Sequence, residues 1–97
     1  MNRINIVYQE KMVKVTDNWY PCYKNNEIKV KLSLNNFNGY YVKLIACGAD
    51  DFILEIEKTC ESFENAILDY FDLQEIYDKI SDGVNKEYFY KLGFIRF

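Results

Sequence analysis

Three consecutive runs decide the fold: EIKVKLSLN at residues 27–35, NGYYVKLIAC at residues 38–47 and FILEIE at residues 52–57. In the first and third runs, apolar residues alternate with polar ones, which is the period of a strand with one buried face. The middle run is apolar on both faces apart from Lys43, as expected for a strand at the centre of a sheet. The runs predict a three-stranded antiparallel meander.

The residues before this meander predict further strands. Residues 3–9 and 12–16 both alternate, and residues 9–11 are expected to form a hairpin loop between them. The only proline follows Trp19 and Tyr20, which predicts an edge strand or a loop there. Trp19 and Tyr20 are candidates for a protein-binding patch, because such aromatics are enriched in binding hot spots. The alternative is that they plug one end of the sheet.

A helical period begins after residue 58. Thr59 is expected to cap a helical region that runs to residue 80. A capping-box-like pattern, Asp72-x-x-Glu75, leaves open whether this region is two helices or one bent helix.

Gly83 suits a left-handed helix end. Asn85 is expected to cap a last short helix through Leu92, with a hairpin at residues 82–83 as the alternative. Residues 94–97 are expected to return as a final strand.

The predicted class is α+β in a single domain, residues 1–97. It combines an antiparallel sheet of five to six strands, in the N-terminal two-thirds, with two to three short helices packed on one face. The inner face of the sheet is expected to hold Ile4, Ile6, Val13, Val15, Ile28, Val30, Leu32, Leu34, Val42, Leu44, Phe52, Leu54 and Ile56. The helices are expected to bury Phe63, Ile67, Tyr70, Ile76, Tyr77 and Phe89.

Composition argues against catalysis. There is no histidine, so the usual general base and the commonest transition-metal ligand are missing. The three cysteines, Cys22, Cys47 and Cys60, are widely spaced and are expected to be reduced, packed thiols. We therefore expect a non-enzyme with no cofactor and no metal.

The chain is also expected to be a cytoplasmic protein of a bacterial host. Its first residues lack an apolar signal core, and no apolar run reaches the roughly 20 residues needed to span a bilayer. Lysine outnumbers arginine ten to two, and asparagine and isoleucine are abundant. These residues have A/T-rich codons, which indicates a low-GC bacterium or a phage or mobile element that lives in one.

Charge is divided unevenly along the chain. The net charge of −3 combines +3 in residues 1–50 with −6 in residues 51–97. Seven acidic residues recur every three to five positions in the helical region, and an ordinary solvated face is the simplest explanation. Such a surface could instead occupy a basic nucleic-acid channel on another protein. The candidates are Glu61, Glu64, Asp69, Asp72, Glu75, Asp78 and Asp82.

The leading hypothesis is a small non-catalytic inhibitor, encoded by a phage or mobile element. It would bind a nuclease or other nucleic-acid-handling defence enzyme through the acidic helices, in the manner of an anti-CRISPR protein. One alternative is an immunity protein or antitoxin that neutralises a cognate toxin. Another is a single-stranded nucleic-acid-binding module, which would use lysines and a tyrosine on one sheet face. Its residues would be Lys14, Lys29, Lys31, Lys43 and Tyr41. A homodimer is compatible with all three hypotheses.

Overall fold

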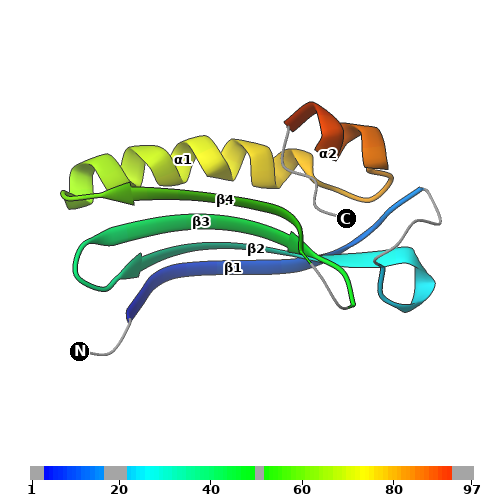
Figure 1. Cartoon of the computed structure of the whole chain (residues 1–97), viewed down its shortest axis with the longest axis horizontal. Coiled ribbons are helices and arrows are strands. Elements are labelled where there is room, and N and C mark those ends of the chain that lie inside the picture. Colours follow the sequence, from blue (N-terminus) through cyan, green and yellow to red (C-terminus); the bar gives the residue numbers. More distant parts are fainter. Residues whose placement is uncertain (1–3, 17–21, 50–51, 93–97) are drawn as a thin grey trace.

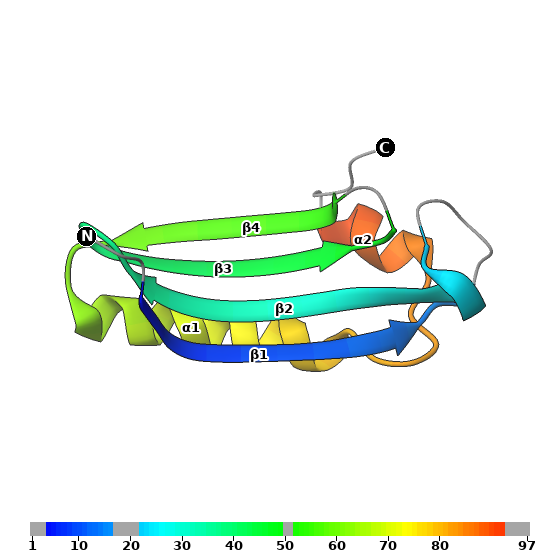
Figure 2. The same cartoon turned by 90° about the horizontal axis from the view of Figure 1, so that it is seen from below.

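The computed structural model describes residues 4–16, 22–49 and 52–92. A sheet of four antiparallel strands, in the order β1-β2-β3-β4, carries two helices on one face (Figures 1 and 2). The strands are β1 (Ile4–Lys14), β2 (Glu27–Asn36), β3 (Tyr40–Cys47) and β4 (Phe52–Cys60), and the helices are α1 (Phe63–Lys79) and α2 (Lys86–Leu92). A single 3-10 turn, η1 (Lys24–Asn26), precedes β2. No helix among these residues is long and apolar enough to cross a membrane.

The predicted meander is confirmed as β2, β3 and β4. Leu32 lies opposite Leu44, and Leu44 lies opposite Ile56, so the apolar residues of neighbouring strands share the face beneath the helices. The turn after β2 uses Asn38 and Gly39, both with positive φ, as the Asn-Gly pair predicts.

The prediction of five to six strands was wrong for the described residues, which contain four. The N-terminal alternation forms one long strand, β1, because residues 9–11 pair with β2 and do not turn. The pairing register shifts between Asn5 and Val7, which leaves Ile6 as an extra, bulged residue. The expected edge strand around Trp19 and Tyr20 and the final strand at residues 94–97 lie outside the described residues.

The bulge changes which β1 residues face the helices. Val7 pairs with the buried Leu34, so Val7, Gln9 and Lys11 lie on the inner face, whereas Ile6 is exposed. Ile6 was therefore wrongly assigned to the core. The side chains of two other expected core residues, Ile4 and Phe52, are not among those described.

Polar residues of β1 consequently meet α1. The side-chain amide of Gln9 hydrogen-bonds the Tyr70 hydroxyl and the Gln74 side chain. The Nζ atom of Lys11 donates to the Tyr77 carbonyl at 2.7 Å and lies 4.1 Å from the centroid of its ring. Burial lowers the pKa of Lys11 from its usual value.

The helical region is one continuous helix. Ala66, Tyr70, Leu73 and Tyr77 are buried at regular helical spacing, with no break at residue 72. Its N-cap is Ser62, whose Oγ accepts from the amide of Asn65 at 3.3 Å.

Two expectations about α1 were therefore wrong. Thr59 does not cap the helix, because it continues β4. Phe63 was expected in the core, but it is exposed.

The second helix forms as predicted. The Oδ1 atom of Asn85 accepts from the Tyr88 amide at 3.1 Å, which caps α2. Gly83 has a φ of 94°, in the left-handed region that favours glycine. Phe89 of α2 is fully buried with the apolar faces of β2, β3 and α1.

Candidate protein-interaction surface

The sheet has one face that the helices do not cover. Figure 2 shows the strands from this side, with both helices behind them. The pairing register places five expected nucleic-acid-binding residues on this face: Lys14, Lys29, Lys31, Lys43 and Tyr41. The sequence-based grouping of these side chains matches their placement.

The same register brings acidic residues against these lysines. Lys43 forms an ion pair with Glu57 at 3.0 Å, Glu10 lies opposite Lys31, and Lys14 lies opposite Glu27. With Glu55 on β4, four carboxylates balance the four lysines of the face. A surface that holds nucleic-acid phosphates carries an excess of positive charge. This sheet face has none.

The acidic residues of α1 behave differently. The helix carries five carboxylates and one lysine, Lys79, which pairs with Glu75 at 3.7 Å. Asp72, Glu75 and Asp78 are exposed on the side away from the sheet, and Glu64 begins the same surface at the helix N-terminus. Their shared exposure leaves a net negative surface along a helix of about 25 Å.

Asp72 lies 4.0 Å from the Nζ atom of Lys58, and Asp78 accepts a hydrogen bond from the Gln74 side-chain amide at 2.9 Å. Two further candidate acids are also paired. Asp69 accepts a hydrogen bond from the Cys60 thiol at 2.8 Å and lies 3.9 Å from the Nζ atom of Lys58. The hydrogen bond to Asp69, followed by burial, raises the pKa of Cys60. Asp82 accepts from the Lys14 amide at 3.0 Å.

Three predicted protein-binding residues remain. Glu61 precedes α1 in the chain, and Trp19 and Tyr20 lie outside the described residues. The structure thus gathers Glu64, Asp72, Glu75 and Asp78 on one side of α1, apart from Asp69 and Asp82.

Sequence analysis missed two apolar members of this surface. Leu68 and Phe71 are 62% and 63% exposed, three residues apart on the outer side of α1. The missed signal is the phase of the helix, because an inward stripe of Ala66, Tyr70 and Leu73 turns residues 68 and 71 outward. We call Glu64, Leu68, Phe71, Asp72, Glu75 and Asp78 the α1 surface.

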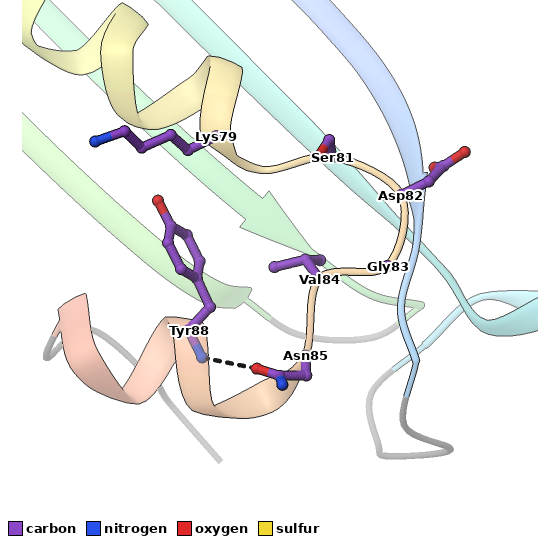
Figure 3. A pocket seen from close by; sticks show the side chains of 7 residues that line it. All are labelled: Lys79, Ser81, Asp82, Gly83, Val84, Asn85 and Tyr88. Atoms are coloured by element: carbon purple, nitrogen blue, oxygen red, sulfur yellow. Dashed lines mark hydrogen bonds between the residues drawn. The ribbon is translucent and has the colours of Figure 1, made fainter.

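A shallow pocket of about 280 Å³ lies where α1 leads into α2 (Figure 3). Its lining comprises Lys79, Ser81, Asp82, Gly83, Val84, Asn85 and Tyr88. Burial raises the pKa of Tyr88, whose hydroxyl points towards the Lys79 side chain in Figure 3. The hydrogen bond drawn in this pocket joins the Oδ1 atom of Asn85 to the Tyr88 amide at 3.1 Å.

The α1 surface is therefore the most distinctive feature of the described residues. It combines an excess of negative charge with exposed apolar side chains, whereas the sheet face is charge-balanced and the pocket is small. No group of three or more possible metal ligands occurs among these residues. Comparisons with models of protein families, with curated proteins and with solved structures gave no match.

Proposed function

We propose that this protein is a non-catalytic inhibitor that binds another protein through the α1 surface. The observation that carries the proposal is the exposure of Leu68 and Phe71 among Glu64, Asp72 and Glu75. Neighbouring exposed apolar side chains rimmed by polar residues mark interaction sites, and aromatic residues are frequent anchors of interfaces.

The geometry favours a helix that lies in a groove. Leu68 and Phe71 are spaced i and i+3, which is the anchor spacing of that recognition mode. Complete burial of a leucine or phenylalanine side chain contributes about 1.5–3 kcal/mol. The surrounding carboxylates then favour a groove with a basic rim, and at low salt they accelerate the association of this chain with its partner.

The partner that fits this chemistry best is an enzyme that handles nucleic acid. Surfaces that bind nucleic acid are basic because they neutralise phosphates. A helix with a row of carboxylates, seated on such a surface, would exclude the nucleic acid by occupying its place. The chain's small size and its abundance of residues with A/T-rich codons favour a phage or mobile element as its source. They likewise favour a bacterial defence nuclease, as in anti-CRISPR inhibition, as its target.

An immunity protein or antitoxin could use the same surface against a cognate toxin. A toxin gene beside this one, and not phage genes, would favour that alternative. Direct binding of single-stranded nucleic acid finds less support, since Glu10, Glu27, Glu55 and Glu57 balance the lysines of the sheet face.

The proposal can be tested by affinity capture followed by competition. The tagged chain is incubated with a low-GC bacterial lysate, with and without nuclease, at low and high salt. We expect a stoichiometric protein that resists nuclease treatment and weakens with salt. The purified partner is then bound to labelled nucleic acid, and added chain should displace that nucleic acid.

Matched charge reversals locate the surface. Changing Asp72, Glu75 and Asp78 to lysine should abolish both capture and displacement, whereas changing Lys29 and Lys31 to glutamate should preserve them. The proposal is overturned if the α1 variant binds as the parent does at every salt concentration. If the captured material is lost after nuclease treatment, and is also lost when Lys29 and Lys31 are changed to glutamate, then the sheet face and not α1 is the binding surface.

A further inference from the structure

The described residues leave one edge of the sheet, strand β1, open over part of its length. Lys14 donates its amide to Asp82 and accepts from the Gly83 amide at 2.9 Å, so its backbone groups point away from β2. Backbone direction alternates along a strand, so Met12, Glu10 and Tyr8 also point outward. No described residue pairs with these outward groups, because the cover from residues 82–84 ends at Lys14.

Exposed apolar side chains gather on this same strand. Eight large hydrophobic residues of the described chain are exposed, and four of them belong to β1: Ile6 (41%), Val7 (38%), Tyr8 (48%) and Met12 (43%). An edge strand with open backbone groups and exposed apolar residues is a template for pairing with another strand. The observations on backbone and side chains therefore indicate the same edge.

We propose that a second copy of this chain pairs with β1 in antiparallel orientation about a two-fold axis at Gln9. In this register Tyr8 of each copy lies opposite Glu10 of the other, and Met12 lies opposite Ile6. On the inner face, Val7 lies opposite the aliphatic stem of Lys11. The two-fold symmetry makes the contact self-complementary and closed.

Neighbouring registers are less favourable. An axis at Glu10 would place two carboxylates opposite one another, and an axis at Lys11 would do the same with two ammonium groups. An axis at Met12 requires the backbone of Lys14, which Asp82 and Gly83 already occupy. The axis at Gln9 avoids all three conflicts and covers the four exposed apolar residues of β1.

The resulting dimer has one continuous sheet of eight strands. Its axis runs perpendicular to the sheet, so both copies of α1 lie on the same side. The Gln9 side chains meet near the axis, where each already hydrogen-bonds Tyr70 and Gln74 of its own chain. The α1 surface remains exposed in both copies, and the dimer does not depend on the function proposed for that surface.

Sedimentation equilibrium over a range of protein concentrations tests the association. We expect a species of twice the 11.6 kDa chain mass. Met12→Lys should weaken self-association by about tenfold or more, which corresponds to about 1.4 kcal/mol. Phe71→Lys is the matched control and should leave the dimer unchanged, although it should abolish partner binding through the α1 surface.

Oxidative cross-linking tests the register. Tyr8→Cys combined with Glu10→Cys should form a disulfide-linked dimer, because opposite residues in a hydrogen-bonded pair have Cα atoms about 5.5 Å apart. Neither single variant should cross-link above the level of the parent chain and its native cysteines. The proposal is overturned by a monomer throughout the concentration series, by a dimer that survives Met12→Lys, or by open-ended oligomers. Such oligomers would indicate a heterologous contact between β1 and β4.

Discussion

Phe71 and Phe89 provide a direct test of how the helices are packed. Phe89 is fully buried, and replacing a buried phenylalanine by alanine typically costs about 3–5 kcal/mol. Phe71 is 63% exposed, so only about a third of its side chain contributes to burial. A third of the roughly 1.5–3 kcal/mol for complete burial gives about 1 kcal/mol or less for Phe71→Ala.

Thermal unfolding followed by far-UV circular dichroism measures both losses. A loss of 1 kcal/mol lowers Tm by roughly 4–8 °C in a domain of this size, so Phe89→Ala should lower Tm by roughly 12 °C or more. Phe71→Ala should lower it by roughly 8 °C or less. Equal losses for the two variants would refute the assignment of Phe71 to the outer side of α1. They would also remove the observation that carries the proposed function.

Three further predictions concern polar groups. Ser62→Ala should lower the free energy of unfolding by about 1 kcal/mol, because it removes the N-cap of α1. Thr59→Ala should change this free energy by less than about 0.5 kcal/mol. A urea titration in which Thr59→Ala costs more than Ser62→Ala would contradict the assignment of the cap. Gln9→Ala should cost about 1–3 kcal/mol because it leaves the buried Tyr70 hydroxyl without this partner, and a neutral result in the same assay would count against that contact. The pKa of the Cys60 thiol is raised in the folded state from its ordinary value of 9.0, chiefly by the hydrogen bond to a neighbouring carboxylate. The protonated thiol therefore stabilises the fold below pH 9.0, and this stabilisation is lost as the pH rises through the folded pKa. The parent should therefore lose stability relative to Cys60→Ser as the pH rises above 9.0, and parallel pH profiles would contradict the assignment.

The sequence predicts the regular, locally determined part of the fold. Alternation in β2, β3 and β4 places Leu32 and Leu44 in the core, and the chemistry of Asn85 predicts the start of α2. These elements follow from side-chain period and capping, which act within a few residues. The pairing of Lys43 with Glu57 was also accessible from the sequence, because neighbouring strands fix which residues lie opposite one another.

The wrong predictions concern residues whose placement depends on tertiary contacts. In β1 the apolar pattern changes phase between Ile6 and Val13, and sequence analysis explained the change by a loop. The strand absorbs it with a bulge, since pairing with β2 satisfies more backbone groups than a turn without glycine would. In α1, apolar residues lie on several sides of the helix, so its inward face is set only by contact with the sheet, and Phe63 was wrongly assigned to the core. The apolar half of the α1 surface was missed for that reason.

The cover over the end of β1 links segments from distant parts of the chain. Val15 pairs with Val84 in parallel, and the Thr16 amide donates to the Val84 carbonyl at 3.0 Å. At synthesis rates of roughly 5–20 residues per second, Val84 is added about 3–14 s after Thr16. During that interval β1 can pair with β2, but its outer edge has no cover from its own chain. In the β1 dimer proposed above, neighbouring ribosomes on one message would hold the two pairing edges close together, so that dimer would begin to form during translation.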